Sequence, residues 1–205
     1  MRFSQPVKTL ICIAALCVSG CATFEMKELE RVYFQADVSE SEQKPSAFID
    51  VQFYKGHPDK RHKELNDVAS SFVSSVEEAV KKSDLFDYYM FNGSKQEAVD
   101  YTIKVDIYID RNKPLAIATY GACFFSNTLI PTIVRDHYWL KVEVVDRNGI
   151  TANEVTNKDG TTLLYGVFLL PFIQKTHSKA YQSTLENQML VALQELAESG
   201  AIKSQ

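Results

Sequence analysis

The four cysteines are the residues of this 205-residue chain with the clearest chemical potential, because a thiol can form a disulfide, bind a metal or carry a lipid. They are Cys12, Cys17, Cys21 and Cys123. An even number of cysteines would allow two disulfides. Three of the four fall within the first 21 residues, so their chemistry depends on the role of that segment.

The first 20 residues have the composition of a signal peptide. Arg2 and Lys8 form a basic start, and residues 10–18 form an apolar stretch that is too short for a permanent membrane-spanning helix. The stretch ends in the run Ser19-Gly20-Cys21, in which small residues directly precede a cysteine. We therefore expect residues 1–20 to be removed from the mature protein.

This order of basic, apolar and small residues resembles the bacterial lipobox, at which signal peptidase II cleaves and leaves the cysteine as a lipidated N-terminus. The resemblance covers residues 1–21 and implies that Cys21 carries acyl chains, more than one of which gives stable anchoring. Ala22 follows, where Asp would mark retention at the inner membrane, so the resemblance implies a lipid anchor on the periplasmic face of the outer membrane. The alternative is an ordinary secretory signal in which Cys21 is incidental.

Cleavage before Cys21 changes the charge and the thiol content of the chain. Residues 1–20 contain two basic and no acidic residues, so the 185 mature residues keep 20 basic and 26 acidic residues, a formal net charge of −6. This balance argues against a nucleic-acid partner. Cys123 is then the one remaining thiol, which excludes an intramolecular disulfide. It lies in an apolar run, where we expect a small buried residue; the alternative is a reactive thiol.

The histidines are the other candidates for metal or catalytic chemistry. His57 and His62 share a charged loop with Asp59 and Glu64, but their spacing matches no standard metal motif, and a solvated loop is the simpler interpretation. The sequence has no motif of zinc proteases, phosphate-binding loops, serine hydrolases or dinucleotide-binding folds. We therefore expect no enzyme activity, no catalytic residue, no metal and no cofactor.

The regular elements alternate between strands and helices. Apolar residues at three- and four-residue spacing are typical of amphipathic helices at residues 63–82 and 178–199. Alternating or β-branched residues predict strands at residues 47–54, 85–91, 100–110, 138–146 and 150–156. Strands with one wet face favour antiparallel pairing. The predicted fold is α+β, a mainly antiparallel sheet packed against two amphipathic helices, in a single domain over residues 47–205 behind a tether at residues 21–46.

Two uncharged apolar segments interrupt this pattern, at residues 114–134 and 160–174. The first is long enough for a spanning helix, but polar residues interrupt its centre and Pro131 lies within it. Glycines and prolines argue against continuous regular structure in both segments: Gly121, Pro131, Gly166 and Pro171. The segments are either buried in the core or exposed as an apolar surface, which usually marks a protein or membrane contact.

The order of elements resembles two families of bacterial lipoproteins. In the curli-secretion lipoprotein, two segments inserted in the strand region build an outer-membrane barrel, which implies an oligomeric pore, export or assembly component. The lipopolysaccharide-assembly lipoprotein pairs helices with a small sheet inside a partner barrel. Residues 115–118 are apolar on both faces and so lack the alternation that barrel strands need.

The residues together predict a non-enzymatic, membrane-anchored envelope lipoprotein that binds another envelope component through residues 114–134 and 160–174. Its predicted partners are the membrane, through the lipid on Cys21, and an envelope protein. The candidate interface consists of the large apolar residues of the two segments: Tyr120, Phe124, Phe125, Leu129, Phe168, Leu169 and Phe172.

Overall fold

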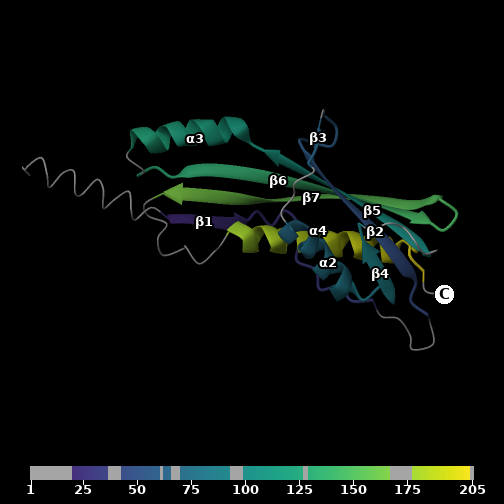
Figure 1. Cartoon of the computed structure of the whole chain (residues 1–205). Helices are drawn as coiled ribbons and strands as arrows, with labels where there is room; N and C mark the ends of the chain where they lie inside the picture. Colours follow the sequence, from purple (N-terminus) through teal and green to yellow (C-terminus); the bar gives the residue numbers. More distant parts are fainter. Residues whose placement is uncertain are drawn as a thin grey trace, which may run out of the picture. The chain divides into compact units, whose positions relative to one another are not determined.

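The computed structural model describes residues 20–36, 43–60, 62–65, 70–92, 99–126, 129–166 and 177–203. These residues contain seven strands and three helices (Figure 1). The helices are α2 (Ser70–Ser83), α3 (Lys113–Phe125) and α4 (His177–Glu198). The strands are β1 (Gly20–Glu25), β2 (Ser46–Lys55), β3 (Lys63–Glu64), β4 (Tyr88–Phe91), β5 (Tyr101–Arg111), β6 (Thr132–Asp146) and β7 (Thr151–Gly166).

The strands form one mixed sheet with the order β1-β7-β6-β5-β2-β3, in which β4 also pairs with β2. β2 is parallel to β4 and β5, whereas β1 pairs antiparallel with β7 and β3 pairs antiparallel with β2. Parallel neighbours need a crossover connection, which α2 supplies between β2 and β4. The predicted α+β class is confirmed, and the parallel pairs around β2 make the sheet mixed.

The described chain groups into two compact units. Unit 1 contains residues 20–26, 111–126, 129–136, 161–166 and 177–181, and unit 2 contains the remaining described residues. Strands β6 and β7 contribute residues to both units. Residues 47–205, which we expected to form one domain, are therefore divided between two units.

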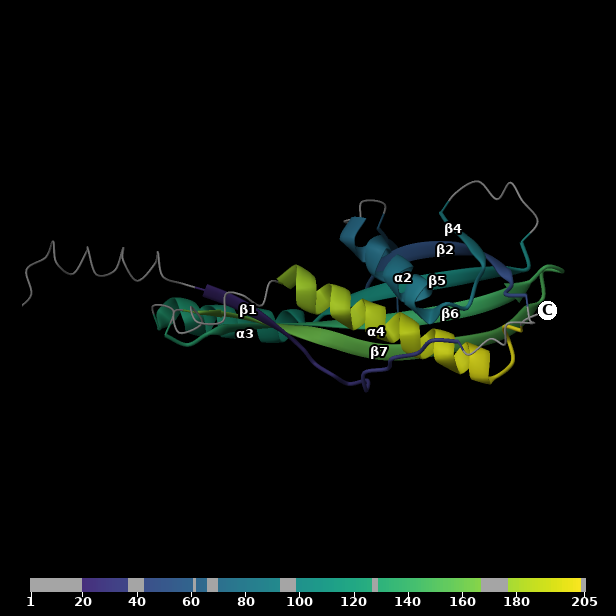
Figure 2. The ribbon, with the colours of Figure 1, turned by 90° about the horizontal axis from the view of Figure 1, so that it is seen from below.

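Unit 2 holds the main hydrophobic core. Figure 2 shows α2 and α4 over one face of the unit 2 strands. Alternate strand residues on that face are fully buried, as the two-residue period of a strand requires: Ile103, Val105, Ile107, Leu140, Val142 and Val144. The helical side of the core repeats at three- and four-residue spacing through Leu185, Met189, Leu193 and Leu196, which are also fully buried.

Both predicted amphipathic helices are present, and the boundaries of α4 agree with the prediction. Gly200, with φ of 72°, ends α4 in the left-handed conformation that glycine tolerates best. The Ala201 N–H donates to the Leu196 carbonyl at 3.1 Å, and the Gly200 N–H donates to the Ala197 carbonyl at 3.0 Å. This pair of bonds is the Schellman arrangement that satisfies the last carbonyls of a helix.

The predicted helix over residues 63–82 is wrong at its beginning. Helix α2 starts at Ser70, and Lys63–Glu64 pair with Tyr54 and Lys55 as strand β3. The Leu65 N–H also donates to the Phe53 carbonyl at 2.8 Å. Backbone groups in this stretch are thus bonded to β2 and are not available for a helical turn.

The predicted hairpin is confirmed, and both of its strands are longer than predicted. β6 begins at Thr132 and β7 continues to Gly166. The turn between them contains Asn148 and Gly149, and Gly149 has φ of 79°, the positive value that this turn requires. The Asp146 N–H donates to the Ile150 carbonyl at 2.9 Å and closes the hairpin.

The first part of the segment that we expected to be a tether, residues 21–46, is structured over residues 21–36. Residues 21–25 belong to β1, which begins at Gly20, and residues 27–36, here called the strap, are held by side chains of unit 2. The Val32 N–H donates to Asn187 Oδ1 at 3.0 Å, and Asn187 Nδ2 donates to the Glu30 carbonyl at 3.0 Å. The Glu28 N–H donates to Asp159 Oδ1 at 3.1 Å, and the Glu28 carboxylate lies 2.9 Å from Lys158 Nζ. The polar residues of the strap, whose composition suggests a solvated linker, therefore bond the strap to α4 and β7.

A buried polar network joins α4 to β6 and β7 inside unit 2. Gln188 is fully buried, and its Nε2 donates to the Tyr138 carbonyl at 2.9 Å and to Asn157 Oδ1 at 3.1 Å. Asn157 Nδ2 in turn donates to the Gln188 carbonyl at 2.8 Å. These bonds fix the register of α4 against the sheet, although Gln188 Oε1 is buried without a hydrogen-bond partner among the described residues.

We predict that Asn157→Ala lowers the free energy of unfolding by about 1–3 kcal/mol, because it leaves buried groups of Gln188 without their partner. Asn153, which is half-buried and donates to Ser199 Oγ at 2.9 Å, provides the matched control. Asn153→Ala should change stability by no more than about 0.5 kcal/mol. Urea denaturation of both variants measures the difference, and equal midpoints would contradict the role of the network.

The Asp159 carboxyl group, which accepts the Glu28 N–H of the strap, has a pH-dependent effect on stability. Burial raises the pKa of Asp159, although backbone N–H donors partly oppose the shift. A raised pKa means that the folded state binds this proton more tightly than the unfolded state does. The contribution of Asp159 to stability therefore falls as the pH rises through the interval between the two pKa values.

We predict that the free energy of unfolding of Asp159→Asn, which cannot ionise at this position, increases relative to that of the native chain as the pH rises from about 4 to about 7. Chemical denaturation at several pH values measures this difference in unfolding free energy. Asp146→Asn is the control of opposite sign, because bonds from Ile150 and Asn148 lower the pKa of that exposed carboxyl. A difference for Asp159→Asn that does not vary with pH would contradict the account.

Candidate functional site

Helix α3 occupies part of the segment in which we expected no continuous regular structure. Asn112 caps its beginning, because the Asn112 side chain accepts the Leu115 N–H at 3.1 Å, and Pro114 lies in the first turn. The helix passes through Gly121 and ends at Ser126, whose N–H donates to the Ala122 carbonyl at 3.0 Å. The expectation for residues 114–125 is therefore wrong. Because β6 begins at Thr132, the uncharged segment is not one long helix.

The inner side of α3 is built from small residues that allow close approach to β6. The Thr119 hydroxyl accepts the Ile133 N–H at 3.0 Å, and the acceptor nearest to its single proton is the Leu115 carbonyl at 2.8 Å, with the Ile133 carbonyl at 3.1 Å. Cys123, on the same side, is buried, as predicted. Thr119 thus bonds α3 to the start of β6, and Figure 1 shows α3 running alongside that strand.

The outer side of α3 carries the large apolar residues. Ile117, Tyr120 and Phe124, spaced by three and four positions, are 73%, 66% and 71% exposed, and Phe125 is 86% exposed. An ordinary surface helix has the opposite arrangement, with large apolar residues facing the core. Leu129 and Ile130 follow the helix and are also exposed. We call these six residues the α3 surface.

The α3 surface is comparable in size with the largest apolar patch of a typical monomer, which is roughly 300–600 Å². An aromatic side chain presents roughly 150–250 Å² when fully exposed, so Tyr120, Phe124 and Phe125 together present roughly 400 Å². Covering the aromatic part alone would gain up to about 10 kcal/mol of transfer free energy, before the costs of association. Patches of this size often serve as contact sites.

The structure places four of the seven predicted interface residues on this surface: Tyr120, Phe124, Phe125 and Leu129. The other three, Phe168, Leu169 and Phe172, lie outside the described residues. Ile117 and Ile130 were missed; Ile117, three positions before Tyr120 and seven before Phe124, would have been indicated if a helix had been recognised, whereas Ile130 follows the helix and has no such spacing. The role of all these residues in binding stays a prediction.

Strand β1 places Cys21 in the same unit as the α3 surface. Cys21 is exposed and lies opposite Tyr165 of β7, in a register that runs from Gly20 and Gly166 to Glu25 and Thr161. Ala22 and Thr23, the next two residues of β1, are buried. The predicted lipidation site is therefore part of a paired strand, and its role as a lipid carrier stays a prediction.

An ion pair closes the base of the chain segment that carries α3. Arg111 Nε donates to Asp136 Oδ1 at 2.7 Å, and Arg111 Nη2 donates to Asp136 Oδ2 at 2.8 Å. The Asn112 N–H also donates to the Arg135 carbonyl at 3.0 Å. Bidentate geometry of this kind fixes both position and direction. The residues just before and just after the α3 segment are thus held together.

The charge of unit 1 differs from that of the whole chain. The described residues of unit 1 contain four basic residues against two acidic ones, a formal charge of +2. The basic residues are Arg111, Lys113, Arg135 and Lys179, and the acidic ones are Glu25 and Asp136. The full sequence, in contrast, has a formal charge of −4. Unit 1 therefore combines an apolar surface with a positive balance.

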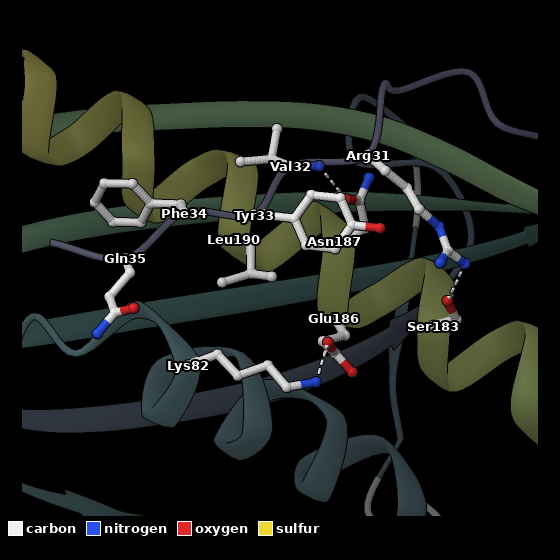
Figure 3. A pocket seen from close by; sticks show the side chains of 10 residues that line it. All are labelled: Arg31, Val32, Tyr33, Phe34, Gln35, Lys82, Ser183, Glu186, Asn187 and Leu190. Atoms are coloured by element: carbon white, nitrogen blue, oxygen red, sulfur yellow. Dashed lines mark hydrogen bonds and ion pairs between the residues drawn. The ribbon is translucent and has the colours of Figure 1, made fainter.

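Unit 2 contains a cavity of about 350 Å³ between the strap and α4 (Figure 3). The charged and polar groups around it bond to one another. Lys82 Nζ lies 2.7 Å from Glu186 Oε1, and this bond raises the pKa of Lys82. Arg31 Nη2 donates to Ser183 Oγ at 2.8 Å. The Arg31 contact docks the strap on α4, and the Lys82–Glu186 pair joins α2 to α4.

The histidines considered for a metal site pack against aromatic rings in unit 2. The His57 ring lies 4.7 Å from the Trp139 ring, and the His62 ring lies 5.0 Å from Tyr54 and 5.1 Å from Tyr108. Within the described ranges, no group of three or more His, Cys, Asp and Glu residues is arranged to hold a metal ion. The same ranges contain no helix with the length and apolar character needed to cross a membrane.

No protein-family model and no curated protein matches the chain. Among solved structures, the PelC dodecamer from Paraburkholderia phytofirmans is 9% identical, with 84% of this chain and 95% of that chain covered and a TM-score of 0.38. A minor lipoprotein from Acinetobacter baumannii is 10% identical, with 86% and 98% covered and a TM-score of 0.39. At TM-scores this low, these similarities assign neither a family nor a function to this chain.

We predict that Thr119→Val lowers the free energy of unfolding by about 1–3 kcal/mol, because the Ile133 N–H loses its side-chain acceptor. Thr119→Ser keeps the hydroxyl group and should retain most of the stability. Hydrogen exchange at the Ile133 amide provides a local measurement, with faster exchange expected in the valine variant alone. Unchanged exchange in Thr119→Val would show that the hydroxyl does not hold α3 to β6.

Proposed function

We propose that this protein is a non-enzymatic envelope lipoprotein, anchored through Cys21 on the periplasmic face of the outer membrane, which binds another envelope component through the α3 surface. The observation that carries the proposal is the outward direction of the large apolar residues of α3. Phe124 and Phe125 are more than two thirds exposed, whereas the small residue Cys123 is buried. A soluble protein gains nothing from this arrangement unless the exposed side is covered.

The concentration of apolar exposure in unit 1 supports a single contact region. Ten large hydrophobic residues are exposed among the described residues, and seven of them belong to unit 1. These seven are the six residues of the α3 surface and Tyr165, which is opposite Cys21. Scattered apolar residues need no explanation, but a cluster in one unit does.

The absence of enzyme activity is proposed because polar groups of unit 2 that could do chemistry have structural partners. In the cavity of Figure 3, Lys82 pairs with Glu186 and Arg31 pairs with Ser183. Asp159, whose pKa is raised by burial, accepts N–H groups of the strap and of Gly160. Arg31 and Asp159 thus hold the strap in place, and the Lys82–Glu186 pair joins α2 to α4, which is a sufficient reason for these contacts.

The anchor is tested by replacing Cys21 with serine and fractionating the cells. The proposal expects the Cys21→Ser chain to carry no lipid and to escape processing by signal peptidase II, because the thioether to the lipid cannot form. A Cys21→Ser chain that is processed and remains with the membranes to the same extent as the native chain would contradict lipid anchoring.

We predict that the α3 surface is covered in native envelopes. A Phe125→Cys variant should react at least about tenfold more slowly with a water-soluble maleimide in isolated envelopes than in the purified Cys21→Ser background, because covered apolar surface excludes water. Ile150→Cys is the matched control, since Ile150 is 64% exposed in the β6–β7 turn of unit 2. Its labelling rate should be the same in both samples. Equal rates for both positions would contradict the binding function.

A complex formed by copies of this chain would also protect Phe125→Cys, as expected for the oligomeric alternative. Detergent extraction followed by mass measurement separates the two cases. A monomer rules out the pore or export assembly, and a stable oligomer that protects the α3 surface would replace the proposed external component with a second copy.

A further inference from the structure

We infer that the component contacted by the α3 surface is the phospholipid leaflet that holds the acyl chains of Cys21, with α3 lying in the plane of the headgroups. This inference rests on the proposed function, because it requires the lipid at Cys21. It specifies a lipid surface where the proposal names only an envelope component. Four features of unit 1 support it: the position of Cys21, the end of the sheet at which α3 lies, the chemistry of the exposed side and the charge.

The pairing of β1 leaves no slack between the lipid and unit 1. Cys21 is in register with Tyr165, and the next residues, Ala22 and Thr23, are buried. A lipoprotein with a free linker can hold its domain away from the membrane, but a linker of zero residues cannot. Acyl chains bonded to Cys21 therefore bring unit 1 itself to the headgroups.

The α3 surface lies at the same end of the sheet as Cys21. β1 begins beside the last residue of β7, Gly166. β6 begins at that end with Thr132, because the hairpin turn joins β6 and β7 at their other ends. β1 and β6 are two strand spacings apart, or about 10 Å. Thr119 holds α3 to Ile133, the second residue of β6, so a leaflet that receives the acyl chains is within reach of α3.

The chemistry of the exposed side matches lipid better than protein. A protein interface makes roughly one hydrogen bond per 100–200 Å² and has a polar rim. The α3 surface offers the Tyr120 hydroxyl alone among its six residues, and no charged residue occurs from residue 114 to residue 134. The helix has 13 residues, or about 20 Å, which suits a helix lying in the interface and is too short to cross a bilayer.

Basic residues flank this apolar side. Lys113 immediately precedes the uncharged run and Arg135 immediately follows it, and both are exposed. Unit 1 has a formal charge of +2, although the mature chain as a whole is acidic. Exposed cations beside an apolar helix favour an anionic phospholipid surface, from which the acidic remainder of the chain is repelled.

The test uses the purified mature chain with Cys21→Ser, so that binding depends on unit 1 and not on the acyl chains. Vesicles of phosphatidylethanolamine with phosphatidylglycerol are compared with vesicles of phosphatidylcholine in a flotation assay. The chain should float with both, and more strongly with the anionic vesicles. Phe124→Ser with Phe125→Ser should reduce binding to both by at least about tenfold, because apolar burial drives it. Ile150→Ser is the control and should bind like the parent chain.

Lys113→Glu separates the electrostatic part from the apolar part. It should weaken binding to the anionic vesicles by about fivefold or more and leave binding to the neutral vesicles unchanged. Thermal unfolding of every variant checks the fold, and Ile117→Ser provides a second apolar variant on the same side of α3 if the double variant is unstable.

Failure of the inference is distinguishable from failure of the proposed function. Protection of Phe125→Cys in envelopes without vesicle binding by the parent chain would overturn the lipid assignment and leave a protein partner as the covering component. Full accessibility of Phe125→Cys in envelopes would overturn the proposed function. Vesicle binding that Ile150→Ser weakens as much as the phenylalanine variants do would also overturn the assignment, because it would not depend on α3.

Discussion

The pairing of β1 with β7 is the constraint on which the account of unit 1 depends. In the chain that begins at Cys21, strand pairing extends from Cys21 and Tyr165 to Glu25 and Thr161, so Cys21 is fixed by this pairing to the sheet. A modification at this residue therefore determines the location of unit 1. If Cys21 carried no lipid, the same pairing would simply provide an edge strand. If Cys21 carries a lipid, the pairing places unit 1 next to the membrane.

The α3 surface follows from how the chain packs α3 against the first residues of β6, a strand that lies between β7 and β5 in the sheet. The bidentate contact between Arg111 and Asp136 holds the two ends of the segment together, and the Thr119 hydroxyl accepts the Ile133 N–H. Close approach of α3 to β6 requires small residues on the inner side of the helix, so the large ones face outward. The packing of α3 and its apolar exposure thus have one structural cause. Unit 2 contributes the large core, with Leu185 and Leu193 fully buried.

The sequence predicts the helices and strands whose apolar residues repeat with a regular period. It does not predict the segments whose structure depends on particular side-chain contacts. The α4 helix, the β6–β7 hairpin and the α+β class were predictable, because their residues repeat with the periods of helix and strand. The period of α3 was obscured, since large and small residues are both apolar there and Gly121 suggested a break. Asn112 followed by Pro114 was the available signal. The strap was not predictable, because its order comes from Asp159 and Asn187, which are more than 100 positions away in the chain.

The most direct measurement is the immersion depth of α3 in the lipidated protein reconstituted into bilayers. An environment-sensitive fluorophore at Phe125→Cys can be quenched either by agents attached to the lipids or by iodide in the water. The account predicts strong quenching by the lipid-attached agents, weak quenching by iodide, and the reverse order for the same fluorophore at Ile150→Cys. Equal quenching by iodide at the two positions would contradict the central claim that α3 lies in the leaflet that holds the anchor.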